Sequence, residues 1–89
     1  MAVEPCLTVV IPCYNEEATV TTVLQQVLAS PYVREVVIVD DGSTDATLER
    51  IATVDDERVR LFVQDVNQGK GAALRRGFAE ATAEYVIVQ

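Results

Sequence analysis

The chain has 89 residues, of which 49% are apolar, and its formal net charge is −7 at pH 7. This length allows one small domain, and the apolar fraction is high enough for a hydrophobic core, which excludes a disordered chain. The negative charge excludes a basic nucleic-acid-binding surface and electrostatic attraction to anionic lipid, so we expect no nucleic-acid partner and no membrane contact by this chain.

The first residues, MAVEPCL, lack the basic region and the apolar segment of a signal peptide, so we expect none. No apolar run approaches the roughly 20 residues that a membrane-spanning helix needs. Cys6 and Cys13 flank the first predicted strand and would lie roughly 20 Å apart, beyond the reach of a disulfide. We therefore expect two free thiols and a cytoplasmic protein. The sequence contains no histidine, which excludes Ser-His and Cys-His nucleophiles and leaves no expected metal site among these residues.

Residues 7–11 (LTVVI) predict the first strand, and Pro12 should end it because proline has no N–H for the ladder. Asn15 is a typical N-cap residue, and two glutamates follow it where the helix dipole favours acids. Apolar residues then recur at helical spacing, at Val20, Val23, Leu24, Val27 and Leu28. This stripe predicts a first helix that ends before Pro31.

Residues 36–39 (VVIV) are consecutive β-branched residues without polar alternation, which is typical of a strand buried on both faces of a parallel sheet. Asp40 and Asp41 follow at once, and Gly42 allows a sharp turn. The next three residues, Ser-Thr-Asp, are good N-cap types, so a second helix should run from about residue 45 to 52. Ligands of open α/β sheets bind outside the carboxyl ends of strands, which makes this turn a candidate binding site.

Residues 59–64 (VRLFVQ) predict a third strand, and Arg58 and Arg60 indicate that it lies at a sheet edge. The loop 65–71 (DVNQGKG) leads to a third helix, and residues 85–88 begin a fourth strand. The residues of the third helix expected to face inward are Leu74, Gly77, Phe78 and Ala81. Alternating strands and helices with short connections predict an α/β fold with parallel strands and right-handed crossovers.

Three loops follow the first three predicted strands, at residues 12–17, 40–45 and 65–71, and in a parallel sheet they gather at one end. Each has a purely structural interpretation, because acids and glycines cap helices and turns, and Tyr14 could cover the sheet end rather than stack on a ring. For the paired aspartates, the sequence supports this interpretation and a binding role about equally. Neither GxxxxGK[ST] nor GxGxxG is present, which disfavours a P-loop and a Rossmann dinucleotide site.

Three segments together resemble the start of a family 2 glycosyltransferase with the GT-A fold. They are VVIPCYNEE at residues 9–17, VVIVDDGSTD at 36–45 and NQGKGAALRRGF at 67–78. The resemblance covers essentially the whole chain, and in finer detail the segments are similar to polyprenyl- and dolichyl-phosphate glycosyltransferases. It implies a three-layer, Rossmann-like half of the GT-A fold, with three helices and four parallel strands in the order 3-2-1-4.

The resemblance also implies a site for the nucleoside diphosphate of a sugar donor. Asp41 resembles the acid that contacts the base, and Lys70 resembles part of the loop beside the nucleotide pocket. The residues expected to bind the nucleotide sugar are Pro12, Tyr14, Asn15, Glu16, Asp40, Asp41, Gly69, Lys70 and Gly71.

In this family an Asp-x-Asp motif that binds a divalent metal, Mg or Mn, follows the fourth strand, and a carboxylate base lies further on. This sequence ends at Gln89, before that point. We therefore expect residues 1–89 to form a single truncated nucleotide-sugar-binding domain of an inverting glycosyltransferase, inactive alone, with metal ligands and catalytic residues beyond Gln89. The finer resemblance indicates polyprenyl phosphate as an acceptor.

Two other classes of protein stay open. One is a receiver-type phosphoacceptor domain, which also gathers acids at strand ends but would place its acidic pair after the first strand. The other is a stand-alone, non-catalytic nucleotide-binding module. Because the fourth strand has no charge between Tyr85 and Gln89 and would lie at an open edge, we also expect a homodimer formed through this strand.

Overall fold

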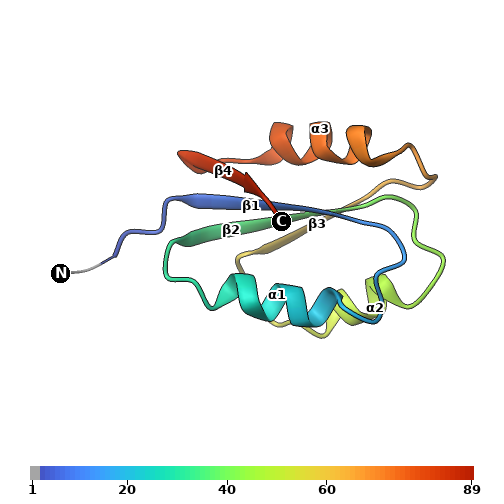
Figure 1. Ribbon diagram of the computed structural model, residues 1–89, viewed down its shortest axis with the longest axis horizontal. Helices are drawn as coiled ribbons and strands as arrows, with labels where there is room; N and C mark the ends of the chain where they lie inside the picture. The colour runs from blue at the N-terminus through green and yellow to red at the C-terminus, as the bar shows by residue number, and fades with distance from the viewer. Residues whose placement is uncertain (1–2) are drawn as a thin grey trace.

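The computed structural model describes residues 3–89, while Met1 and Ala2, which begin the segment in which no signal peptide is expected, lie outside the described residues. Within residues 3–89 strands and helices alternate along the chain (Figure 1). They are β1 (Leu7–Cys13), α1 (Val20–Leu28), β2 (Val33–Asp40), α2 (Thr47–Ala52), β3 (Val59–Val63), α3 (Lys70–Glu80) and β4 (Tyr85–Val88).

The four strands form one parallel sheet in the order β3-β2-β1-β4. Helix α3 covers one face, and α1 and α2 cover the other, which gives three layers (Figure 1). The expected α/β class, the strand order 3-2-1-4 and the parallel pairing are therefore confirmed. Strand β3 lies at an edge, as Arg58 and Arg60 predict, and β4 forms the opposite edge.

Strand β2 is the centre of the core. Its residues Val36, Val37, Ile38 and Val39 are all completely buried, as their unbroken β-branched run predicts. Because side chains alternate along a strand, Val36 and Ile38 pack with Leu24 of α1, while Val37 and Val39 pack with Ala73 of α3. One strand thus anchors both helical layers and fixes the position of the turn that follows it.

Strand β1 continues through Pro12 to Cys13, so the prediction that proline ends it is wrong. The backbone oxygen of Cys13 accepts a hydrogen bond from the Asp41 N–H on the β2 side, whereas the Val10 oxygen accepts one from the Gln89 N–H on the β4 side. By this alternation Pro12 faces the β4 side, beyond the last β4 residue, Val88. The missing N–H therefore does not interrupt the pairing with β2, which continues through Pro12 to Cys13 opposite Asp40, and the strand tolerates the proline.

Two predictions about the helices are also wrong. Helix α1 begins at Val20, after Thr19, so Asn15 does not cap it. On α3 the buried residues are Ala73 and Gly77, while Phe78 is 50% exposed. The two small residues let α3 approach the sheet closely, and Phe78, one position further around the helix, is turned away from that contact.

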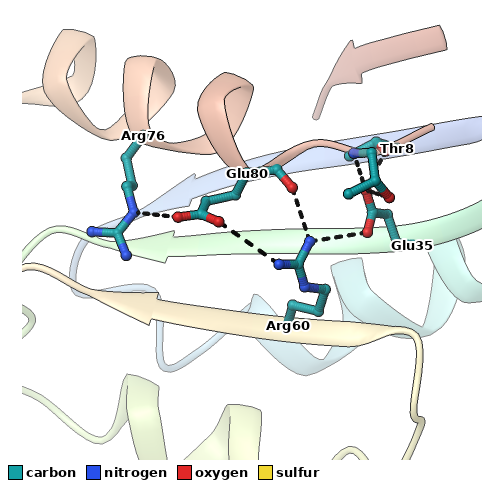
Figure 2. Close-up of polar contacts among 6 residues, drawn as sticks. Thr8, Glu35, Arg60, Arg76 and Glu80 are labelled. Carbon is teal, nitrogen blue, oxygen red and sulfur yellow. Dashed lines mark hydrogen bonds and ion pairs between the residues drawn. The ribbon is translucent and has the colours of Figure 1, made fainter. Parts of the chain in front are cut away.

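A cluster of polar residues closes the end of the sheet where the strands begin. Glu35 on β2 accepts hydrogen bonds from Thr8 on β1 at 2.7 Å and from the Thr82 N–H at 2.6 Å. Arg60 on β3 pairs with Glu35 at 3.1 Å and with Glu80 at 3.7 Å, and Figure 2 shows Arg60 between the two carboxylates. This cluster links β1, β2 and β3 to the connection between α3 and β4.

The longest helix described, α3, has 11 residues. Within residues 3–89 no helix combines the length and apolarity that a membrane crossing requires.

Candidate functional site

A cavity of about 310 Å³ opens where β1 and β2 end and α3 begins. Its walls come from the loops after β1, β2 and β3 and from the first turn of α3, so the expected convergence of three loops is observed. The lining residues are Pro12, Cys13, Tyr14, Glu16, Asp41, Asn67, Gly69, Lys70 and Ala73.

The loop after β1 is held by the loop after β2. Asn15, with φ of 52°, donates its N–H to the Ser43 hydroxyl at 2.9 Å, and its side-chain oxygen accepts the Thr44 N–H at 2.8 Å. The Glu16 N–H is donated to the Thr47 hydroxyl at 2.8 Å. Asn15 therefore fastens two loops together, and its neighbours Tyr14 and Glu16 are left exposed at the cavity.

Asp40 lies beneath the cavity rather than in its wall. It is completely buried, and its carboxylate accepts the Ser43 N–H at 2.9 Å and the Ser43 hydroxyl at 2.5 Å. These bonds shape the turn that follows β2, which corresponds to the structural interpretation of this residue. Asp40 is therefore not placed to contact a molecule in the cavity.

Asp41 belongs to the cavity wall and is only 4% exposed. Its Oδ1 accepts hydrogen bonds from the Gln64 side chain and from the Gln68 N–H, both at 2.7 Å, and its Oδ2 accepts the Gly69 N–H at 2.9 Å. The carboxylate thus joins the end of β2 to the loop before α3. It combines the two roles between which the sequence could not decide, because it builds a turn and also faces the cavity.

Charge in the cavity is mixed. Glu16 and Asp41 contribute carboxylates, and Lys70, the first residue of α3, is exposed and contributes an ammonium group. A cation at the N-terminal end of a helix, where N–H groups are unpaired, suits an anionic ligand. The carboxylates suit hydrogen-bond donors such as ring N–H groups and hydroxyls.

The Cys13 thiol is a poor nucleophile although it lines the cavity. Its burial, followed by the charge of Asp40, raises the pKa of this thiol to about 12. Its sulfur donates to Asp40 Oδ1 at 3.6 Å. Cys6 and Cys13 are both free, as expected. Within residues 3–89 no group of three or more His, Cys, Asp or Glu side chains comes together to hold a metal ion.

Six of the nine predicted binding residues line this one cavity, namely Pro12, Tyr14, Glu16, Asp41, Gly69 and Lys70. Asn15 and Asp40 support the walls, and Gly71 lies outside the lining. Sequence reasoning missed Cys13, Asn67 and Ala73 as lining residues. Asn67 begins the NQGKG segment, and Ala73 lies one helical turn after Gly69, so both could have been found from spacing.

Comparison with known proteins identifies the relationship. The family model for glycosyl transferase family 2 matches residues 8–89. The succinoglycan biosynthesis protein ExoO of Rhizobium meliloti is 39% identical over 85 residues, which are 94% of this chain and 24% of that protein. The poly-beta-1,6-N-acetyl-D-glucosamine synthase of Staphylococcus aureus is 37% identical over 91% of this chain and 20% of its own length. The chain thus spans about a quarter or less of these two relatives.

Solved structures agree with the sequence match. The mannosyltransferase PcManGT of Pyrobaculum calidifontis, in complex with GDP-Man and Mn²⁺, superposes with a TM-score of 0.82 and 33% identity, over 94% of this chain and 26% of that one. The glucosyl-3-phosphoglycerate synthase of Mycobacterium tuberculosis, in complex with UDP, gives a TM-score of 0.74 at 33% identity, over 94% of this chain and 33% of that one. With its parallel sheet, its three converging loops and a match over residues 8–89, the chain belongs to glycosyl transferase family 2.

Proposed function

We propose that this chain is the nucleotide-binding part of an inverting glycosyltransferase, and that its cavity holds the nucleoside diphosphate of a sugar donor. The observation that carries this proposal is the convergence of Tyr14, Glu16, Asp41 and Lys70 on one cavity at the carboxyl ends of β1 and β2. Two similar proteins were solved with GDP-Man and with UDP, which supports the same class of ligand for this chain.

Each group has a role that its chemistry suits. Tyr14 is 43% exposed and offers a ring on which a base can stack. Asp41 offers an acceptor for a base N–H or a ribose hydroxyl. Lys70 offers a cation to the diphosphate. Transfer itself would proceed by attack of an acceptor hydroxyl or phosphate on the anomeric carbon of the donor.

The divalent metal of the similar mannosyltransferase structure is not provided for by the described residues, since none of their acidic groups forms a cluster able to hold it. We propose that the metal ligands and the catalytic base belong to residues outside this sequence, and that residues 1–89 form a single nucleotide-sugar-binding domain. Reading the codons that follow Gln89 would test this, because an Asp-x-Asp pair there supports it and its absence favours a stand-alone binding module.

We propose polyprenyl phosphate as the first acceptor to test with the complete enzyme, because the YNEE and NQGKGAAL segments resemble the polyprenyl-phosphate enzymes. The two free thiols support a cytoplasmic location. A receiver-type phosphoacceptor domain is disfavoured by the family match and by the position of the acidic pair at the end of β2 rather than of β1. Labelling of the chain by a small phosphodonor in the presence of Mg²⁺ would support that alternative instead.

Replacing Asp41 with alanine should weaken the binding of UDP or GDP. Without a bound metal we expect the wild-type chain to bind these diphosphates with a dissociation constant near the millimolar range, which corresponds to a binding free energy of about 4 kcal/mol. The Asp41→Ala change removes an acceptor in the cavity wall, and Tyr14→Ala removes the exposed ring without touching the core, so both variants should bind at least about tenfold more weakly. Titration calorimetry or chemical-shift titration measures both.

Glu57→Ala is the control for these variants, because Glu57 is an exposed carboxylate in the turn between α2 and β3. It should bind nucleotides as the wild type does. Equal losses from Glu57→Ala and Asp41→Ala would contradict the placement of the site and would indicate only a general effect of charge.

We also propose that the chain forms a homodimer through β4. All four residues of this edge strand are exposed, and three of them are Val86, Ile87 and Val88. An uncharged, apolar edge with unpaired backbone groups is a template for another strand. Two-fold pairing would give a continuous sheet of about eight strands, within the usual range.

Ile87→Lys should shift this dimer to monomer, because it places a charge in the middle of the proposed contact. Light scattering coupled to size exclusion, over a concentration series, reports the mass. Tyr32→Lys, at an equally exposed position away from β4, is the matched control and should stay dimeric. A wild-type chain that remains monomeric at high concentration would show that β4 makes no such contact.

A further inference from the structure

The side chain of Gln64 binds the carboxylate of Asp41, although Gln64 is not among the residues that line the cavity. Gln64 is the residue after β3 and is only 9% exposed. Its backbone N–H is donated to the Asp40 oxygen at 2.8 Å, and its side-chain amide is donated to Asp41 Oδ1 at 2.7 Å. We infer that Gln64 is a positioning residue for nucleotide recognition, which sets the orientation of Asp41 without lining the cavity itself.

The hydrogen bonds at Asp41 determine which acceptor positions of its carboxylate remain open to a ligand. An ionised carboxylate oxygen has two lone pairs. Among residues 3–89, Oδ1 has two donors, the Gln64 side chain and the Gln68 N–H, which use both lone pairs, whereas Oδ2 has one, the Gly69 N–H. A ligand in the cavity can therefore approach only the remaining position on Oδ2. If the Gln64 amide is removed, one lone pair of Oδ1 is freed, and only the backbone N–H groups of Gln68 and Gly69, among the described donors, still hold the carboxylate. The orientation of the acceptor position on Oδ2 is then less firmly fixed.

The loop that supplies the other donors has little room to move. A Cβ atom on Gly42, which has φ of +80°, would lie 3.0 Å from the Asn67 nitrogen and 3.4 Å from the Gln64 oxygen. The backbone of residues 64–67 thus packs directly on the turn after β2, and only glycine leaves the space for it. This contact keeps the backbone of residues 64–67 against the turn, so the Gln64 side chain is the donor to Asp41 that a substitution can remove without moving the loop. We call the three hydrogen bonds from Gln64, Gln68 and Gly69 the Asp41 clamp.

The inference rests on the proposed function, since it assigns to Gln64 a part in the binding of a nucleoside diphosphate. Its first test is Gln64→Leu, which keeps an apolar stem in a buried position and removes the donor. We expect UDP and GDP to bind about tenfold more weakly than to the wild type, the size of effect that loss of one charged hydrogen bond produces. In the nucleotide-free chain, the amide protons of Gln68 and Gly69 should also exchange about tenfold faster.

Gln64→Glu gives a readout that a purely structural role would not change. At about pH 8 this variant places a second carboxylate against Asp41. Its dissociation constant for UDP or GDP should therefore be at least about tenfold that of the wild type. As the pH falls, one carboxyl of the pair takes up a proton and can donate its O–H to the other, as the glutamine amide does. The ratio should therefore fall to within about threefold near pH 5, whereas the ratio for Gln64→Leu should stay constant.

Other titratable groups face this site from the neighbouring elements. They are Cys13 at the end of β1, Tyr14 and Glu16 after it, Asp40 at the end of β2, Asp65 beside Gln64, and Lys70 at the start of α3. They are present in the wild type and in both variants, and so are the phosphates of UDP and GDP. Because these groups titrate in the variant and in the wild type alike, their contribution cancels in the ratio of the two dissociation constants. The pH dependence of that ratio therefore reports the change at position 64.

Gln25→Leu and Gln25→Glu, at an exposed position of α1, are the matched controls and should bind as the wild type does. If the wild type binds UDP or GDP and Gln64→Leu binds them equally well, or if the Gln64→Glu ratio does not change with pH, the inference is overturned. If the wild type binds neither nucleotide, the proposed function fails, and the amide exchange of Gln68 and Gly69 still tests whether Gln64 positions Asp41. Unchanged exchange in Gln64→Leu overturns that role, and faster exchange supports it.

Discussion

Replacing Glu35 with alanine should lower the free energy of unfolding by about 3 kcal/mol, the scale expected when one partner of a buried, hydrogen-bonded ion pair is removed. The Glu35 carboxylate binds Thr8 and Arg60, as Figure 2 shows, and it also binds Thr82. These three partners come from different parts of the chain. Its loss leaves these donors without their acceptor and loosens the link from α3 to β4. Chemical denaturation measures the change, and Glu84→Ala, at an exposed position nearby, should have little effect.

The same carboxylate should make stability depend on acid. Burial raises the pKa of Glu35, but hydrogen bonds from Thr8, from Thr82 and from Arg60 outweigh burial and lower the pKa from 4.5 to about 2. A pKa that is lower in the folded state contributes stability above about pH 4.5, and this contribution disappears as the pH falls through 2. Protonation of Glu35 should therefore lower the free energy of unfolding by about 3 kcal/mol as the pH falls from 4.5 to 2.

Glu35→Gln should show a flatter dependence of unfolding free energy on pH over the same window, because it keeps the volume of the side chain and removes the titration. Other acids contribute to both proteins and cancel in the difference. If wild type and Glu35→Gln lose stability in parallel between pH 4.5 and 2, the cluster does not stabilise the ionised carboxylate as its hydrogen bonds indicate.

Gly77→Val should destabilise the chain by about 3 kcal/mol, at the upper end of the usual cost of overpacking a core. A Cβ atom at Gly77 would lie 2.3 Å from Cγ1 of Val10, which is completely buried on β1. Val10 has a stiff, β-branched side chain and cannot move aside easily. The added side chain would therefore push α3, and with it the first turn that carries Lys70, away from the sheet.

Ala79→Val is the control for this variant, since it adds the same side chain at an exposed position of α3 and changes mainly helix propensity. Adding Val10→Ala to Gly77→Val should restore part of the lost stability, because it removes the methyl groups that the new side chain meets. Thermal or chemical unfolding that shows equal effects for Gly77→Val and Ala79→Val would contradict the close approach of α3 to β1.

Much of the fold could be predicted because its signals are local. The run of β-branched residues in β2 indicated burial on both faces, and alternating strands and helices indicated a parallel sheet. Parallel strands bring their following loops to one end, which was enough to expect Tyr14, Asp41 and Lys70 at one cavity.

What could not be predicted depends on contacts between distant residues. The spacing within α3 did not reveal that Gly77 meets Val10, and so it placed Phe78 on the wrong face. The sequence around Glu35 did not indicate its hydrogen-bond partner Thr82, because Thr82 lies 47 residues away in the sequence. Asn15 is a typical helix cap, yet here it binds Thr44 across the turn after β2. In each case the contact that decides the role of the residue is made with a part of the chain that is distant in sequence, and the residue type does not reveal it.

A nuclear magnetic resonance titration of the wild-type chain with UDP and with GDP tests most directly whether the cavity binds a nucleoside diphosphate. We predict saturable shifts near the millimolar range for the amides of Tyr14, Asp41, Gly69 and Lys70. The amides of residues 55–58, in the turn between α2 and β3, should not respond. Shifts confined to that turn, or none at the cavity at any nucleotide concentration, would contradict a nucleotide site at the carboxyl ends of β1 and β2.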